Sequence, residues 1–325
     1  RPKPGAVKTV LCNTKSKSGA AQPFRTAWQY YEYIRKVQAK MAEFVLSAFA
    51  DEYSPNFDEQ LEGLKKNGVG YMEIRGVDGK NIGDLTEDEM KAAKAKLDAA
   101  GIGVSSIGSP IGKIKVTDDF DAHMKKLANC VKAAKIFGTE NIRIFSFYIP
   151  EGMTREECRP EVMQRLARMF EYAESEGVTL CHENEKGIYG ESAECCMDIQ
   201  KEFDGRIKLI FDPANFVMDG HESYPAAYNL LGDKIYYMHI KDATADKVIC
   251  PAGKGIGGVP QILADLDKKR DGKIFLSVEP HLKVFKGFES LEATGDKTIM
   301  PENTYSSNTE AFGVAVKALK DIIGK

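Results

Sequence analysis

From Met41 onward, short runs of β-branched and aromatic residues alternate eight times with longer segments whose apolar residues recur at helical spacing. Several helical segments begin with a threonine that is followed three residues later by an acid, as at Thr86 and Thr154, a pattern typical of a capping box. Several end at a glycine, such as Gly101 and Gly138. Strands are predicted at 43–50, 70–75, 103–108, 141–148, 178–183, 208–212, 235–240 and 274–279. Helices are predicted at 57–67, 86–100, 118–137, 154–176, 191–203, 223–232, 259–270 and 305–323.

Strands that alternate with helices pair in parallel through right-handed crossovers. A closed barrel and a doubly wound open sheet both satisfy this pattern. No G-x-G-x-x-G follows the first strand, and eight units of similar length favour closure. We therefore predict an α/β fold, a (β/α)8 TIM barrel that forms a single catalytic domain over residues 41–325.

Residues 1–40 differ from the rest of the chain. They contain nine lysines and arginines and a single acid, Glu32, and they show neither a strand period nor a helix period. We expect Met41 to be the native start and residues 1–40 to be a basic extension outside the core, either non-native or disordered. An organelle transit peptide, which is also basic and poor in acids, and a structured segment are the alternatives.

The composition narrows the class of protein. The 325 residues are 43% hydrophobic and carry a net charge of −3, which is ordinary for a globular protein and gives no field that attracts nucleic acid. No apolar run approaches the ~20 residues that cross a bilayer, which argues against a membrane protein. The seven cysteines are an odd number without C-x-x-C spacing, which indicates reduced thiols and predicts a cytoplasmic location. We expect a small-molecule partner, and a homo-oligomer remains possible.

In a TIM barrel the chemistry lies at the carboxyl ends of the strands. The last four predicted strands end at or beside Glu183, Asp212, His239 and Glu279. Four ionisable groups there would be partly buried, which is costly unless they pair with or coordinate something. Three carboxylates and one imidazole suit a divalent cation, and the missing thiolates argue against a structural zinc site. We expect one ion, Mn²⁺ in the first place, with Co²⁺, Mg²⁺ and Zn²⁺ as alternatives.

Five segments carry a family likeness. They are HENEKGIYG (182–190), FDPANF (211–216), MHIKDA (238–243), PAGKGIGG (251–258) and SVEPH (277–281). Together they resemble the sugar phosphate isomerase/epimerase family of xylose-isomerase-like TIM barrels. The resemblance implies one divalent metal ion held by Glu183, Asp212, His239 and Glu279. It also implies that Glu183 and Glu279 act as an acid/base pair on opposite faces of a bound sugar.

The residue types agree with that chemistry. Removal of a proton α to a carbonyl creates an enediolate, whose charge a metal ion bound to substrate oxygens can absorb. If one glutamate takes the proton and the other returns it, the result is an isomerase or epimerase of a sugar, sugar phosphate or keto-sugar.

Three rival functions use the same scaffold. A metal-dependent lyase would let the same enediolate expel a β-leaving group, as in dehydration of a keto-inositol or cleavage of an oxidised glycoside. An abasic-site endonuclease needs several zinc ions and a basic DNA face, for which five histidines and an acidic barrel are a poor match. A non-catalytic sugar-binding barrel would not need the four ionisable groups.

Further side chains are candidates for substrate contact. Lys241 lies on the same strand face as His239. Asn215 could instead cap a helix, and Glu73 could instead pair with Arg75. The full set of substrate-binding candidates is Lys241, Asn215, His281, Glu185 and Glu73.

Two other sequence features bear on the substrate. Family members that act on free ketoses often have a histidine and an arginine where this chain has Asn215 and Ala245, which argues against a free-ketose 3-epimerase. The glycine-rich segment 253–258 could bind a phosphate through its amides or form a lid. His123 and His221 are expected at the surface.

Overall fold

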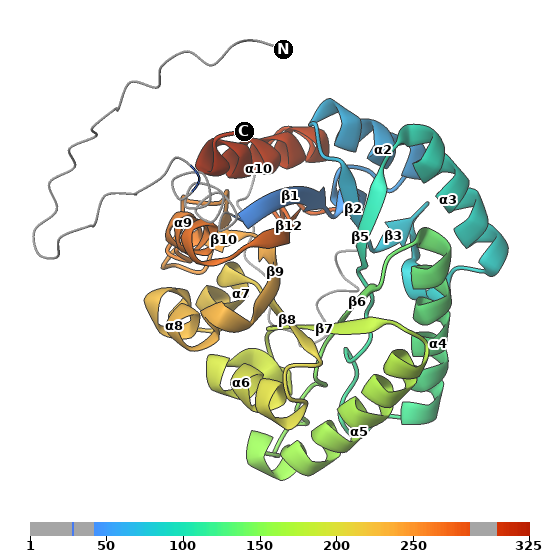
Figure 1. Cartoon of the computed structure of the whole chain (residues 1–325), viewed down its shortest axis with the longest axis vertical. Helices are drawn as coiled ribbons and strands as arrows, with labels where there is room; N and C mark the ends of the chain where they lie inside the picture. The colour runs from blue at the N-terminus through green and yellow to red at the C-terminus, as the bar shows by residue number, and fades with distance from the viewer. Residues whose placement is uncertain (1–27, 29–41, 287–303) are drawn as a thin grey trace, which may run out of the picture. The chain divides into compact units, whose positions relative to one another are not determined.

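Eight parallel strands close into a barrel in the computed structural model, which describes residue 28, residues 42–286 and residues 304–325. Around the barrel the strands follow the order β1, β12, β9, β8, β7, β6, β5 and β2 (Figure 1). The predicted TIM barrel is confirmed. The barrel strands are β1 (Ala42–Ala48), β2 (Tyr71–Ile74), β5 (Gly103–Ile107), β6 (Asn141–Ile144), β7 (Thr179–Glu183), β8 (Lys208–Phe211), β9 (Ile235–Ile240) and β12 (Gly272–Val278).

Helices surround the barrel on its outer side (Figure 1). Capping boxes at Thr86 and Thr154 begin α3 and α5, and α3 and α4 end at Gly101 and Gly138 in the left-handed conformation, as the sequence predicted. The outer helices are α2 (Phe57–Lys66), α3 (Glu87–Ala100), α4 (Phe120–Phe137), α5 (Arg155–Ser175), α6 (Ala193–Glu202), α8 (Tyr228–Leu231), α9 (Val259–Lys269) and α10 (Asn308–Ile323).

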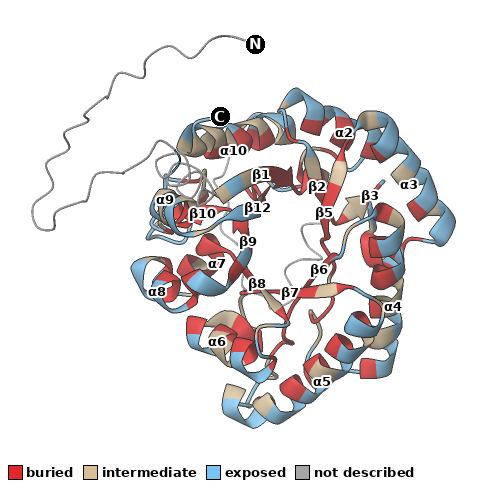
Figure 2. Cartoon of the chain, viewed as in Figure 1, coloured by how far each residue is buried: buried red, intermediate tan, exposed pale blue. Residues whose placement is uncertain are grey.

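The core has two parts, because successive strand residues point to opposite sides of the sheet. Leu209, Phe211 and other outward-facing strand residues pack with apolar helix residues between the barrel and its helices. Cys181, Ile210 and Tyr237 form a separate cluster. Figure 2 shows the strands buried and the outer faces of the helices exposed. Since Glu183 and His239 lie two residues beyond Cys181 and Tyr237 on their strands, they point to the same side of the sheet.

The barrel is closed by its first and last strands. β1 pairs with β12 in seven consecutive residue pairs, from Ala42 with Gly272 to Ala48 with Val278. β1 pairs with β2 only at Ser47–Tyr71 and Ala48–Met72. The first strand is therefore held mainly by the last one.

Some short elements were not predicted. A short helix, α7 (Pro213–Met218), follows β8 at once, with Asp212 as its N-cap and Pro213 in its first turn. The loops contain two small hairpins, β3 (Gly76–Val77) with β4 (Lys80–Asn81), and β10 (Asp242–Ala243) with β11 (Ile249–Cys250). The helix predicted at 223–232 is a wide turn at Ser223–Ala227 followed by the four-residue α8.

Residues 1–27 and 29–41 lie outside the described residues. The predicted domain boundary at Met41 and the nature of the extension 1–40 therefore remain predictions. Within the described residues, no helix combines the length and the apolarity that a membrane crossing requires.

Candidate metal centre and active site

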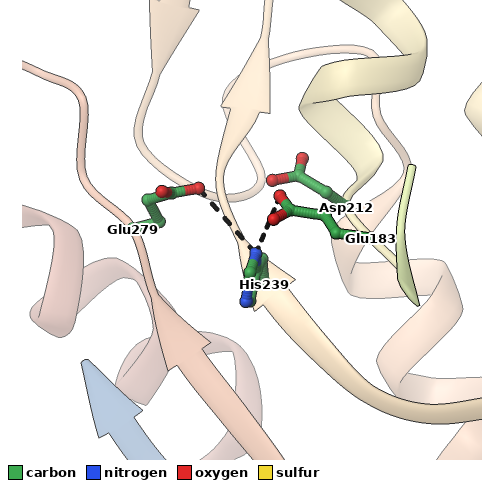
Figure 3. A group of neighbouring side chains, drawn as sticks. All are labelled: Glu183, Asp212, His239 and Glu279. Carbon is green, nitrogen blue, oxygen red and sulfur yellow. Dashed lines mark ion pairs between the residues drawn. The ribbon is translucent and has the colours of Figure 1, made fainter. Parts of the chain in front are cut away.

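The four predicted metal ligands lie together at the carboxyl end of the barrel (Figure 3). Glu183 is the last residue of β7, Asp212 follows β8, His239 is the fifth residue of β9, and Glu279 follows β12. All four are buried, and one candidate ligand atom from each lies within 4.8 Å of the others. Because β12, β9, β8 and β7 are neighbours in the barrel, four strand ends one after another supply the group.

The polar atoms of this group are incompletely satisfied by the protein. His239 Nδ1 lies 2.9 Å from Glu183 Oε1 and 3.9 Å from Glu279 Oε2, but it makes no hydrogen bond. Asp212 Oδ2 is also buried without a hydrogen bond. Three carboxylates and an imidazole, two of whose facing atoms have no hydrogen-bond partner, are a donor set that fits a divalent cation. The group could therefore hold a metal ion.

Lys241 lies among the same oxygens. Its Nζ is 2.9 Å from Glu279 Oε2 and 3.2 Å from Asp212 Oδ2. Burial opposes the charge on the ammonium, but Asp212 and Glu279 outweigh burial and raise the pKa of Lys241 above its ordinary value. Lys241 is thus a permanent cation that offsets part of the negative charge of the group.

Two of the predicted ligands have pKa values that reflect this crowding. Burial, together with the nearby charges of Glu183 and Glu279, raises the pKa of Asp212 to about 7 despite Lys241. Burial disfavours the imidazolium of His239, but Glu183 and Glu73 outweigh it and raise the pKa of His239 to about 10. Glu183 and Glu73 thus favour the protonated imidazole, and a metal ion that binds Nδ1 would compete with a proton for that nitrogen.

Two buried arginines contact Glu183 or Glu279. The sequence suggested one of them, Arg75, only as a partner of Glu73 and did not point to the other, Arg143. Arg75 Nη1 donates to Glu279 Oε1 at 2.9 Å, and the rest of its guanidinium binds Asp51 and Glu52. Arg75 thus pairs with these three acids rather than with Glu73.

Arg143 bridges the two glutamates on the oxygens that face away from His239. Its Nη1 lies 3.3 Å from Glu183 Oε2 and 3.8 Å from Glu279 Oε1. Burial would raise the pKa of Glu279, but Lys241, His281, His239 and Arg75 together hold it well below its ordinary value.

The substrate-binding candidates have different surroundings. Asn215 Nδ2 donates to Glu183 Oε1 at 3.1 Å and to the carbonyl of Asn184, so Asn215 fixes the position of a ligand carboxylate. Glu185 pairs with Lys113 at 2.9 Å. Lys113 was not singled out from the sequence, because no local pattern marks a lysine in that loop.

His281 and Glu73 are held by other site residues. His281 has a positive φ of 43°, and its backbone N–H donates to Glu52 Oε2 at 2.7 Å. Its Nδ1 lies 3.5 Å from Lys241 Nζ. Glu73 is fully buried, with one oxygen 3.2 Å from His239 Nε2, so it lies behind the imidazole.

The glycine-rich segment 253–258 does not offer its amides to a phosphate. The backbone N–H groups of Gly253, Gly255 and Gly257 donate to the carboxylate of Asp242, which is fully buried. A Cβ on Gly255 would lie 2.2 Å from the carbonyl oxygen of Ala243, which explains the need for glycine there. The suggested phosphate cradle is therefore wrong for these three amides.

The family model of the xylose isomerase-like TIM barrel matches residues 61–294. The chain belongs to this family. No sequence of a curated protein matches the chain significantly. The resemblance noted from the five sequence segments is thereby confirmed at the level of the family.

Solved structures give the same fold. The probable 3-DHS dehydratase AsbF of Bacillus anthracis, at 16% identity and a TM-score of 0.63, matches over 85% of this chain and 98% of its own. The IOLI protein with a bound zinc atom, at 17% identity and a TM-score of 0.63, matches over 86% and 98%. D-Allulose 3-epimerase of a Methylomonas species, in complex with D-allulose, matches at 17% identity and a TM-score of 0.62 over 88% and 97%. At these identities the likeness establishes the fold alone.

Proposed function

We propose that this chain is a divalent-metal-dependent isomerase or epimerase of a sugar, sugar phosphate or keto-sugar. The observation that carries the proposal is the buried convergence of Glu183, Asp212, His239 and Glu279 at four neighbouring strand ends. The likeness to a D-allulose 3-epimerase with its sugar bound supports the substrate class. Cytoplasmic location and a homo-oligomeric state remain predictions.

Glu183, Asp212, His239 and Glu279 would hold the ion. Mn²⁺ is our first choice for its identity, and the zinc atom in the similar IOLI protein supports Zn²⁺ as the alternative. When bound, the ion would supply positive charge that stabilises the negative charge appearing on substrate oxygens as the α-proton leaves.

The protein's own residues would move the proton. Glu279 has a lowered pKa, so it is a carboxylate at neutral pH, the form that accepts a proton. Glu183 would deliver or take the proton on the opposite face of the sugar. Arg143, within 3.8 Å of both carboxylates, would keep the two apart and oriented. Lys241, Asn215, His281 and Glu185 stay candidates for contact with substrate hydroxyls.

A lyase is the second candidate. The likeness to a probable 3-DHS dehydratase favours it, because a dehydratase can begin with the same loss of a proton next to a carbonyl. The two functions differ only in the step after proton loss. Return of the proton gives an isomer, and departure of a β-leaving group gives an unsaturated product.

The test is proton exchange in D₂O. The full chain, loaded with Mn²⁺ or Zn²⁺, is incubated with a library of free, phosphorylated and keto-sugars, and the products are read by proton NMR. We expect deuterium at the carbon next to the carbonyl, and the product identifies isomerase, epimerase or lyase. Metal-loaded protein that exchanges no proton in any member of a broad library would overturn the proposal.

Two matched variants assign the roles. Glu183→Gln and Glu279→Gln keep the shape of the side chain but remove the proton acceptor, so each should lose about 10²- to 10⁴-fold in turnover. The exposed Glu62 on α2 supplies the control, and Glu62→Gln should leave turnover unchanged. Metal content is measured in every variant. Normal turnover by either site variant with metal bound would exclude the two-glutamate mechanism.

A further inference from the structure

A further carboxylate contacts His239 from the side opposite Glu183 and Glu279. Glu73, the third residue of β2, is fully buried in the barrel. Its Oε2 lies 3.2 Å from His239 Nε2, and its Oε1 accepts a hydrogen bond from the Tyr237 hydroxyl at 2.9 Å. That hydroxyl also lies 3.2 Å from Ser106 Oγ. Glu73 on β2 is therefore held in place by two side chains of β9, a strand that is not its neighbour in the barrel.

The imidazole of His239 has one orientation in this environment. Figure 3 shows one ring nitrogen facing Glu183 and Glu279 and the other pointing away from them. The first is Nδ1, 2.9 Å from Glu183 Oε1, and the second is Nε2, which faces Glu73. The ring of Phe49 contacts the imidazole edge to face at a centroid distance of 5.1 Å. The ring thus cannot exchange its two nitrogens without breaking several contacts.

A carboxylate at this position needs a reason beyond packing. An ionised group without water is costly inside a protein unless it is paired and hydrogen-bonded. A neutral acceptor would satisfy the Tyr237 hydroxyl equally well, and elsewhere inside the barrel hydroxyl groups satisfy one another, as Ser47 and Ser105 do. Of the two side chains that face Glu73, only the imidazole of His239 is stabilised more by a negatively charged acceptor than by a neutral one.

We propose that Glu73 is a positioning residue that accepts the Nε2–H of His239 and so presents the Nδ1 lone pair to the divalent ion. The inference rests on the metal binding in the proposed function, but not on the reaction. It gives Glu73 a role behind a ligand in place of the substrate contact predicted from the sequence. A carboxylate behind a metal-binding histidine fixes the tautomer and strengthens the nitrogen as a ligand, and its loss typically weakens metal binding about 10- to 100-fold.

The experiment compares Glu73→Gln with Tyr237→Phe in the full chain. The glutamine keeps the shape of Glu73 and removes its charge, whereas the phenylalanine removes a different donor to Glu73 and leaves its contact with His239. Both proteins are stripped with a chelator, checked for folding by thermal denaturation, and titrated with Mn²⁺ and Zn²⁺ by calorimetry. We expect a Kd about 10- to 100-fold weaker for Glu73→Gln, and a much smaller change for Tyr237→Phe.

Nitrogen NMR of ¹⁵N-histidine-labelled protein loaded with Zn²⁺ gives a second measurement. The wild type should have a metal-bound Nδ1 and a protonated Nε2, and the Nε2–H proton should move upfield in Glu73→Gln because its acceptor is neutral. A metal-bound Nε2, an unchanged Kd, or equal losses in both variants would overturn the inference.

The outcomes separate this inference from the proposed function. A Glu73-dependent Kd in a protein that exchanges no substrate proton supports the role of Glu73 and refutes the reaction. Proton exchange with an unchanged Kd in Glu73→Gln refutes only the role of Glu73. A wild type that binds no divalent ion refutes both.

Discussion

Asp212 has a separate task for each carboxylate oxygen. Oδ1 accepts the backbone N–H of Asn215 at 3.0 Å and caps α7, whereas Oδ2, which makes no hydrogen bond and lies 3.2 Å from Lys241 Nζ, is the candidate ligand atom. Asp212→Asn can keep the capping oxygen but replaces Oδ2 by an amino group, which does not bind a metal ion. Asp212→Ala removes both oxygens. The two variants therefore separate metal binding from helix capping.

The size of each effect follows from those contacts. An ion present at 100 times its Kd stabilises the folded state by about 2.7 kcal/mol. In a domain of this size 1 kcal/mol moves the Tm by roughly 1.5–2 °C, so metal should raise the wild-type Tm by roughly 4–5 °C. Neither variant should show this rise. Loss of the cap costs about 1 kcal/mol, which sets the Tm of Asp212→Ala roughly 1.5–2 °C below that of Asp212→Asn without metal.

The assay is thermal denaturation of chelator-stripped full chain at pH 8, with and without Mn²⁺ at 100 times the wild-type Kd. At this pH Asp212, with a pKa of about 7, is largely ionised in the wild type. Elemental analysis measures the bound ion in parallel. A full metal-dependent rise in Asp212→Asn would refute the assignment of Oδ2 as a ligand atom. Equal Tm values for the two metal-free variants would refute the capping role.

Three other predictions concern the stability of the protein. Burial lowers the pKa of His182 to about 3. As the pH falls below 6.5, the His182 imidazole therefore takes up a proton in the unfolded chain but not in the folded protein, which favours unfolding. Unfolding in urea should therefore show a loss of roughly 2 kcal/mol from this group between pH 6.5 and 5, absent in His182→Gln. Gly255→Ala places a Cβ 2.2 Å from a carbonyl oxygen and should lower the free energy of unfolding by roughly 1–3 kcal/mol. Gly70→Ala, which has open space around it, should leave that free energy unchanged. Equal effects of the two substitutions would contradict the close approach at Gly255. Removal of residues 1–40 should leave Tm and metal content unchanged, and a drop of several degrees would show that the segment packs on the barrel.

The sequence predicted that the four candidate metal ligands lie together because strand ends can be read from the pattern. Glu183 and Asp212 fall at the ends of short β-rich runs that are correctly bounded to within one residue. Arg143 was missed for the opposite reason. The predicted strand ran to residue 148, which made Arg143 a mid-strand residue, but β6 ends at Ile144 and Phe147 has a positive φ of 67°.

Other features depend on contacts that a local pattern does not contain. His123 was expected at the surface, and this was wrong: it is buried, and its Nε2 accepts the N–H of Gly112 at 2.7 Å. The carboxylate of Asp242 binds amides 11 to 15 residues further along the chain, so the glycine-rich loop resembled an anion site until its internal anion was located. In both cases the partner lies in a loop whose path only the tertiary structure defines.

The pairing of β1 with β12 has a consequence for the order of folding. With seven residue pairs to the last strand and two to its neighbour β2, β1 stays largely unpaired until the end of the chain has been made and docked. Such long-range pairing is slow to form. Glu279 directly follows β12, which also pairs with β9, so the four candidate ligands come together only after this last strand has docked. An ion that needs all four groups would bind tightly only once β12 has docked, and by mass action it would stabilise the docked position of the last barrel strand, with which β1 then pairs.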